Sequence, residues 1–166
     1  NILDKGEYVG GREIIKFENN ISKLCKTKYA VALNSGTDAL TIALHLLNVR
    51  KGDEVIGVAA GFPTTVNPIV QFGAIPVFVD VDLTTHNINA DLIEAAITSK
   101  TKAIMLAHTL GNPFNLKKIR ELCDKYNLWL VEDCCDALGA KYNGTHAGTF
   151  GDIATCSFYP AHHITM

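Results

Sequence analysis

Short apolar runs alternate along this chain with longer segments that have helical periodicity. The runs that predict strands are 29–33, 54–58, 75–79, 103–107, 129–132 and 154–158. Alternation of this kind is typical of strand–helix–strand crossover units, which build a largely parallel sheet. We therefore expect an α/β fold in which a mainly parallel sheet is flanked by helices.

The segments between the predicted strands carry apolar residues at helical spacing. In the first such segment the face expected to pack on the sheet is formed by Leu40, Ala43, Leu44 and Leu47. Two further helices are expected to begin at capping asparagines. Asn89 would precede a face of Ile93, Ala96 and Ile97, and Asn115 one of Leu116, Ile119, Cys123 and Tyr126. The pair Asn143-Gly144 predicts a type I′ hairpin, because both central residues must take positive φ.

Composition indicates one globular domain and excludes several classes of protein. The chain has 166 residues, 48% hydrophobic and 19% charged, which suits a single domain with a sizeable core and no internal boundary. A net charge of −2 offers no basic surface to a phosphate backbone, so we expect a small ligand and no nucleic acid. The longest apolar runs, such as 103–107, fall far short of the ~20 residues that cross a bilayer, so no membrane partner is expected.

The cysteines and the ends of the chain give two further expectations. Five cysteines, an odd number without a C-x-x-C pair, form a poor disulfide framework, so we expect a reducing cytoplasm. The chain begins at Asn1 without an initiator Met or signal peptide, and it stops at Met166 directly after a dense polar and aromatic stretch. We interpret the chain as a fragment of a larger protein.

Three common site motifs are absent. No two of the 13 glycines are spaced as G-x-G, which excludes the dinucleotide fingerprint. Gly6 and Gly11 have the spacing of a phosphate loop, but Arg12 and Glu13 stand where Lys and Ser or Thr are needed. The pairs Cys134-Cys135 and His162-His163 are adjacent in sequence, and adjacent residues rarely converge on one ion, so no metal site is expected.

A candidate phosphate site lies at the junction of the first predicted strand and helix. The sequence there is Asn34-Ser35-Gly36-Thr37. Free backbone N–H groups at a helix start favour an anion, Gly36 permits close approach, and Thr37 adds a hydroxyl. The alternative is an ordinary helix start capped by Ser35 or Thr37, and the pattern alone leaves both interpretations open.

A candidate carboxylate lies at the end of another predicted strand. Asp133 follows the apolar run 128–132, and open α/β sheets bind ligands at the carboxyl ends of their strands. Such a carboxylate can pair with the protonated ring nitrogen of a pyridoxal cofactor. Phe62 could lie flat on a cofactor ring, and Ser157 could supply another phosphate hydroxyl. The alternatives are a helix cap for Asp133 and a core position for Phe62.

The motifs, taken in order, resemble the DegT-type sugar aminotransferases, which are fold type I pyridoxal phosphate (PLP) enzymes. The matching stretches are 34–37, 52–55, 76–80, 132–133, 148–152 and 157–158. The resemblance implies that residues 1–166 are the N-terminal part of the cofactor-binding large domain, which is incomplete here and lacks its C-terminal domain. It also implies that Gly36, Thr37 and Ser157 bind the cofactor phosphate, that Phe62 stacks on the ring and that Asp133 pairs with the ring nitrogen. Asp136 stands where many relatives carry Gln near the cofactor oxygen.

The chain departs from the aminotransferases at one decisive position. In that family a lysine follows Ser-Phe by four residues and forms the imine with the cofactor, whereas this chain has His162. Imidazole cannot form that imine. The stretch 157–166 resembles the sugar 3-dehydrase branch, typified by the CDP-4-keto-6-deoxyglucose 3-dehydrases of lipopolysaccharide biosynthesis. That resemblance implies pyridoxamine phosphate (PMP) held without a covalent bond, His162 as the base, and loss of the C3 hydroxyl of a nucleotide-linked keto-sugar.

The resemblance also implies partners. The expected substrate is a nucleotide-linked sugar, with CDP and GDP both open, and a separate reductase would complete the route to a 3,6-dideoxyhexose. A [2Fe-2S] cluster is implied for the full-length protein, with cysteine ligands outside this chain. A homodimer is expected, and whether the segment is active alone stays open.

The sequence leaves two other functions open. A conventional PLP-dependent sugar aminotransferase needs a lysine that reaches the cofactor, and Lys141 is the nearest candidate after Asp133, although it suits a solvated hairpin better. A noncatalytic sugar-binding fragment is the alternative from another class. His163 is expected at most to position its loop, and His108 is expected to be a hydrogen-bonded residue of the core.

Overall fold

The computed structural model describes residues 10–162 and residue 164. The chain forms two compact units, Asn1–Asn34 and Ser35–Met166. The larger unit contains every described strand and all the predicted site residues, so the fold is described mainly for this unit. None of the described helices has the length and apolar character needed to span a membrane.

The smaller unit contains a helix that sequence reasoning missed. Helix α1 (Arg12–Cys25) follows Gly11, which provides no side-chain cap. Its C-cap is Lys26, which takes a left-handed φ of 55° and donates its backbone N–H to the Lys23 carbonyl. Without a capping side chain at its start, this helix lacks the clearest local signal of a helix N-terminus.

The predicted first strand, 29–33, is wrong. These residues form no strand, and Tyr29 and Val31 are 75% and 73% exposed. The backbone N–H of Ala32 donates to Oε1 of Glu18 at 2.9 Å instead of to a neighbouring strand. A run of β-branched and aromatic residues becomes a strand only when another strand pairs with it, and none of the described strands does so.

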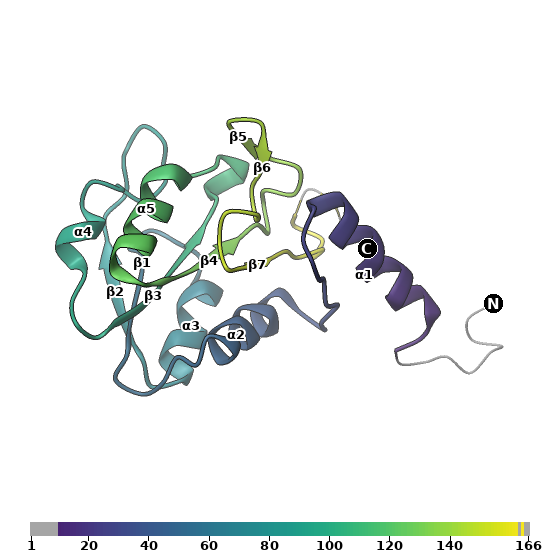
Figure 1. Cartoon of the computed structure of the whole chain (residues 1–166), viewed down its shortest axis with the longest axis horizontal. Coiled ribbons are helices and arrows are strands. Elements are labelled where there is room, and N and C mark those ends of the chain that lie inside the picture. Colours follow the sequence, from purple (N-terminus) through teal and green to yellow (C-terminus); the bar gives the residue numbers. More distant parts are fainter. Residues whose placement is uncertain (1–9, 163, 165–166) are drawn as a thin grey trace. The chain divides into compact units, whose positions relative to one another are not determined.

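The larger unit is built on a parallel sheet, which confirms the predicted fold class (Figure 1). Its five strands lie in the order β2-β1-β3-β4-β7, and every pairing is parallel. They are β1 (Glu54–Val58), β2 (Ile75–Val79), β3 (Thr101–Ala107), β4 (Trp129–Asp133) and β7 (Ile153–Thr155). The last is shorter than the predicted 154–158, because its partner β4 ends at Asp133, opposite Thr155.

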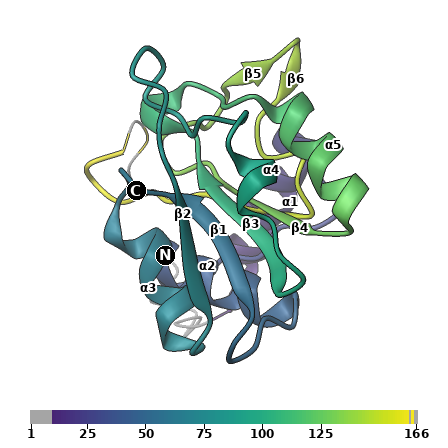
Figure 2. The same ribbon diagram turned by 90° about the vertical axis from the view of Figure 1, so that its left-hand side faces the viewer.

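Helices cover both faces of the sheet (Figure 2). Helices α2 (Gly36–Leu46) and α3 (Pro63–Gln71) lie on one face, and α4 (Ile93–Ala96) and α5 (Leu116–Tyr126) lie on the other. A sheet covered on both faces needs apolar side chains on both, and the side chains of strand β3 alternate between the two faces accordingly. Ala103 and Met105 belong to the apolar cluster under α2 and α3, whereas Ile104 and Leu106 belong to the cluster under α5.

The predicted helix faces and turns are mostly confirmed. Leu40, Ala43, Leu44 and Leu47 are buried, and Asn115 caps α5 by accepting a hydrogen bond from the Lys118 N–H at 3.2 Å. The hairpin of β5 (Lys141–Tyr142) and β6 (Thr145–His146) has positive φ at both Asn143 and Gly144.

The Asn89 cap is wrong, and a second helix was missed. Asn89 accepts from Asp91 N within a local turn, and α4 begins only after Leu92. Helix α3 escaped prediction because Pro68 lies inside it.

The face of α2 predicts a specific stability difference. Leu44 is 0% exposed and Leu46 is 68% exposed on the same helix. We expect Leu44→Ala to lower the free energy of unfolding by about 2–5 kcal/mol, because it leaves a cavity in the core. Leu46→Ala, the matched control, should change it by less than about 0.5 kcal/mol. Urea unfolding followed by circular dichroism measures both, and equal effects would contradict this packing.

Candidate functional site

The predicted site residues gather at one edge of the sheet, where the parallel strands end. Gly36 and Thr37 begin α2, and Phe62 lies between β1 and α3. Asp133 and Asp136 come from the end of β4 and the turn after it, whereas Ser157 and His162 follow β7. Parallel strands bring their carboxyl ends to one side, which is where open α/β sheets bind ligands.

The start of α2 forms a cradle with Ser157. Ser35 caps the helix, since its Oγ accepts from the Asp38 N–H at 3.1 Å. A Cβ on Gly36 would lie 3.0 Å from Cβ and 3.3 Å from Oγ of Ser157. Glycine at position 36 therefore lets Ser157 lie directly against the helix start, whereas any side chain there would push Ser157 away. The cap interpretation and the phosphate interpretation are compatible, because Ser35 provides the cap and leaves Gly36 and Thr37 for an anion.

Asp133 is a buried carboxylate beside this cradle. It is 6% exposed, and its Oδ1 accepts from the Cys135 N–H at 3.1 Å. Its Oδ2 lies 3.5 Å from Oγ1 of Thr65, in the first turn of α3. The Sγ of Cys135 lies 3.7 Å from the Cβ position of Gly36, so the turn that follows Asp133 contacts the start of α2. Thr65 was missed by sequence reasoning, although a threonine in the turn after Phe62-Pro63 was a usable signal.

His162 and Asp136 form a direct contact. Nδ1 of His162 lies 2.8 Å from Oδ1 of Asp136, and both side chains are partly buried. The backbone also holds the histidine, because its N–H donates to the Tyr159 carbonyl at 2.9 Å. The Tyr159 ring lies edge-on to the imidazole, with 6.1 Å between ring centroids. The predicted contact of Asp136 with the cofactor stays a prediction.

Phe62 lies at the same edge but exposes its ring. Its carbonyl accepts from the Thr65 N–H at 3.0 Å, and the residue is 72% exposed. An exposed phenyl ring at the edge where the parallel strands end is compatible with the predicted stacking on a cofactor ring. It is not compatible with the alternative that Phe62 lies in the core. His163 lies outside the described residues, so its predicted role in the loop has no structural description.

A buried carboxylate supports the loop next to Asp133. Glu132 is 0% exposed, and its oxygens accept from the N–H groups of Gly148, Phe150 and Gly151 at 2.5–2.8 Å. Its Oε2 also lies 3.0 Å from Nε2 of His108. Burial alone would raise the pKa of Glu132, but the hydrogen bonds from His108 and the loop outweigh it and lower the pKa.

His108 is thus the hydrogen-bonded core residue expected from the sequence. Its ring stacks on Phe114 with 4.2 Å between centroids. It also belongs, with Glu132 and Cys134, to the one group of potential metal ligands found among the described residues. The Glu132 oxygens are already occupied by four donors, and burial raises the pKa of the Cys134 thiol, which disfavours the thiolate that a metal needs. A group with one thiol does not fit an iron–sulfur cluster either.

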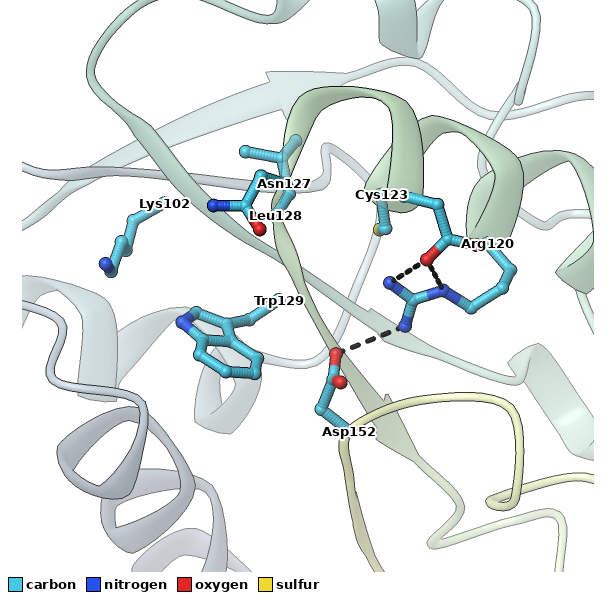
Figure 3. A pocket seen from close by; sticks show the side chains of 8 residues that line it. Lys102, Arg120, Cys123, Asn127, Leu128, Trp129 and Asp152 are labelled. Carbon is cyan, nitrogen blue, oxygen red and sulfur yellow. Dashed lines mark hydrogen bonds and ion pairs between the residues drawn. The ribbon is translucent and has the colours of Figure 1, made fainter.

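A pocket of about 270 Å³ lies at the opposite edge of the sheet, where β3 and β4 begin (Figure 3). It is lined by Lys102, Arg120, Cys123, Asp124, Asn127, Leu128, Trp129 and Asp152. Arg120 is already paired with Asp124 and Asp152, and burial raises the pKa of Cys123 to about 12. Both carboxylates of this pocket, Asp124 and Asp152, are paired with Arg120 (Figure 3), and none of the predicted site residues lies here.

Sequence comparison identifies related proteins. Residues 1–166 match the DegT/DnrJ/EryC1/StrS aminotransferase family. The lipopolysaccharide biosynthesis protein RfbH of Salmonella typhimurium is 58% identical over 97% of this chain and 39% of the relative. The dTDP-4-dehydro-2,6-dideoxy-D-glucose 3-dehydratase of Saccharopolyspora spinosa is 52% identical over 90% of this chain and 34% of the relative. The chain thus spans between a third and two fifths of these relatives' length.

Solved structures with the same fold include an aminotransferase and a dehydratase. An aminotransferase from Psychrobacter cryohalolentis has a TM-score of 0.95 at 39% identity, over 99% of this chain and 42% of that one. The E. coli GDP-4-keto-6-deoxy-D-mannose-3-dehydratase with bound hydrated PLP has a TM-score of 0.93 at 35% identity, over 99% of this chain and 44% of that one. The likeness covers aminotransferases and dehydratases alike.

The Glu132 contacts predict a stability change that depends on pH. We expect Glu132→Gln to lower the free energy of unfolding by about 3–5 kcal/mol at neutral pH, because the amide turns a donor toward groups that are themselves donors. The pKa of Glu132 is lowered by folding, so its contribution is full above the ordinary glutamate value of about 4.3 and is lost as pH falls through the lowered pKa.

The matched control is Glu121→Gln, on an exposed position of α5. Unfolding curves for both variants and the unmodified protein, at pH 7 and at pH 4 and below, measure the difference. A difference between Glu132→Gln and the unmodified protein that does not shrink on acidification would contradict an ionised Glu132.

Proposed function

Because the chain belongs to the DegT/DnrJ/EryC1/StrS aminotransferase family, we propose that it forms the cofactor-binding part of a PMP-dependent sugar 3-dehydrase. The reaction would remove the C3 hydroxyl of a nucleotide-linked 4-keto-6-deoxyhexose. The observation that carries this proposal is His162, which occupies the position of the expected imine-forming lysine at the ligand edge.

The described residues fit a phosphorylated pyridine cofactor. The Gly36–Ser157 cradle would accept the phosphate, because a helix start and a hydroxyl meet where no side chain intervenes. Asp133, buried at the end of β4, would accept a hydrogen bond from the protonated ring nitrogen. The exposed ring of Phe62 would cover the cofactor ring, and Thr37 would add a second hydroxyl at the phosphate.

Each of these residues would contribute to a dehydration. When bound, PMP supplies an amine for the sugar's keto group and a ring that takes up electrons. His162 would accept a proton at Nε2, the nitrogen that faces away from the Asp136 contact. The Asp133 carboxylate would keep the ring nitrogen protonated. A separate reductase would supply the electrons that complete the deoxygenation.

Lys141 supports the dehydrase more than the aminotransferase. It lies exposed on β5, where its backbone pairs with His146 in the Asn143-Gly144 hairpin. A surface hairpin is the position expected for a solvated lysine. An imine-forming lysine instead needs to project into the space between Asp133 and the Gly36–Ser157 cradle.

The relatives support a sugar of this class and its pathway. One is named as a lipopolysaccharide biosynthesis protein and others as 3-dehydratases of dTDP- or GDP-linked sugars. We therefore include lipopolysaccharide dideoxysugar synthesis in the proposal, with the nucleotide left as CDP, GDP or dTDP. A second copy of the chain as a dimer partner belongs to the proposal through the family resemblance alone.

The absence of an imine can be tested on the full-length protein. Incubation with PLP, reduction with borohydride and peptide mapping should yield no lysine adduct, whereas PMP should bind reversibly. His162→Lys is the matched control, since it restores an amine at the expected position and should give an adduct there. His162→Asn should slow dehydration by at least about 10²-fold, because it removes the proton acceptor.

Each other outcome identifies a different function. An adduct on Lys141 or another native lysine would replace the dehydrase by the aminotransferase. Failure to bind either PLP or PMP would favour a noncatalytic sugar-binding protein.

The phosphate cradle gives a second test. We expect Gly36→Ala to weaken PMP binding on the order of tenfold, because its methyl group would lie 3.0 Å from Cβ of Ser157 and displace the Ser157 hydroxyl from the helix start. Gly57→Ala is the control, since a Cβ there meets only the Met105 carbonyl, at 3.7 Å. Absorbance titration with PMP measures both, and equal affinities would place the phosphate elsewhere.

A further inference from the structure

We propose that Asp136 is a positioning residue that fixes the tautomer and orientation of His162, leaving Nε2 as the proton acceptor. The inference rests on the proposed function, because it assigns a role within the same site. It gives Asp136 a task that the sequence did not indicate, since the two residues lie 26 positions apart.

Both members of the pair are held by their own turns. Asp136 lies in the turn after β4, where the Ala137 N–H donates to the Cys134 carbonyl at 3.0 Å and the Cys135 N–H donates to Asp133. His162 lies in a second turn, closed by its backbone bond to Tyr159. The two turns follow β4 and β7, which are paired neighbours in the sheet. Their contact is therefore set by the sheet and needs no flexible segment to close.

The chemistry of the contact selects one imidazole tautomer. An ionised carboxylate has only acceptor atoms, so Nδ1 of His162 must carry the proton that bridges to Oδ1 of Asp136. In a neutral imidazole the other nitrogen, Nε2, then carries the lone pair. A base needs this lone pair, and the opposite tautomer would present an N–H at Nε2 and could not accept a proton there.

The same carboxylate stabilises the product of proton transfer. Once Nε2 has accepted a proton, the imidazolium keeps its Nδ1–H bond to Asp136, and that bond becomes charge-assisted on both sides. The side chains are 22% and 40% exposed, so the contact is partly shielded from competing water. The contact uses Oδ1 of Asp136, so it is compatible with the predicted position of Asp136 near the cofactor oxygen.

The tautomer can be read directly in the full-length protein. Nitrogen-15 NMR on histidine-labelled protein without cofactor reports which ring nitrogen carries hydrogen, and His162→Gln assigns the signal. We expect Nδ1–H in the unmodified protein and a shift toward the Nε2–H tautomer in Asp136→Asn, whose amide can donate to Nδ1. An Nε2–H signal in the unmodified protein would overturn the proposal without the need for any variant.

Kinetics supply the second readout. Asp136→Asn should lower kcat on the order of 10²-fold or more, as expected when a base is held in the wrong tautomer, with KM changed by less than about threefold. Asp136→Glu keeps a carboxylate acceptor and should recover at least about tenfold of that loss. Asp91→Asn, at a surface carboxylate 81% exposed, is the control and should leave kcat unchanged. An unchanged kcat in Asp136→Asn would overturn the proposal.

The two proposals can fail separately. If the unmodified protein performs no dehydration but shows the Nδ1–H tautomer, lost in Asp136→Asn, the proposed function fails and the positioning role stands. If dehydration requires His162 but the tautomer and kcat are the same in Asp136→Asn, the function stands and the positioning role fails.

Discussion

The carboxylate of Glu132 organises the edge of the sheet on which the proposed site is built. An ionised carboxylate taken out of water costs several kcal/mol unless its oxygens are fully bonded. Glu132 meets this demand with three backbone N–H groups of the 148–151 loop and with His108. A Cβ on Gly151 would lie 2.7 Å from the Leu130 carbonyl, so only glycine lets the loop approach this closely. That approach brings β7 alongside β4, and with it Ser157 and His162.

Side chains alternate between the two faces along a strand, so the adjacent residues Glu132 and Asp133 face opposite sides of the sheet. Leu130 lies in the cluster under α5 and Val131 in the cluster under α2 and α3, so Glu132 and Asp133 continue toward opposite faces. Glu132 meets the loop on one face. Asp133 faces the side of α3, where Thr65 approaches it. A substitution at either position therefore affects a different property, although the two share a peptide bond.

Sequence reasoning succeeded where the signal was local and periodic. The strands, the face of α2 and the Asn115 cap follow from residue spacing, and the strand ends predicted the edge that gathers Gly36, Asp133 and Ser157. It failed where the structure depends on distant residues or on weak local signals. The run 29–33 needs a strand partner, and α3 contains Pro68. The Asp136–His162 contact joins two turns that only the β4–β7 pairing brings together.

The short length of β7 has a consequence for the order in which the site is completed. With three residues, and bonded on one side to β4, β7 is the least anchored strand of the described sheet. Local opening in proteins concentrates in such segments. Because Ser157 and His162 both follow β7, opening of this strand would remove the proposed phosphate ligand and the proposed base together. A ligand that contacts both Ser157 and His162 would shift the opening equilibrium of β7 toward the closed form. Binding of the ligand would therefore increase the local order of this strand.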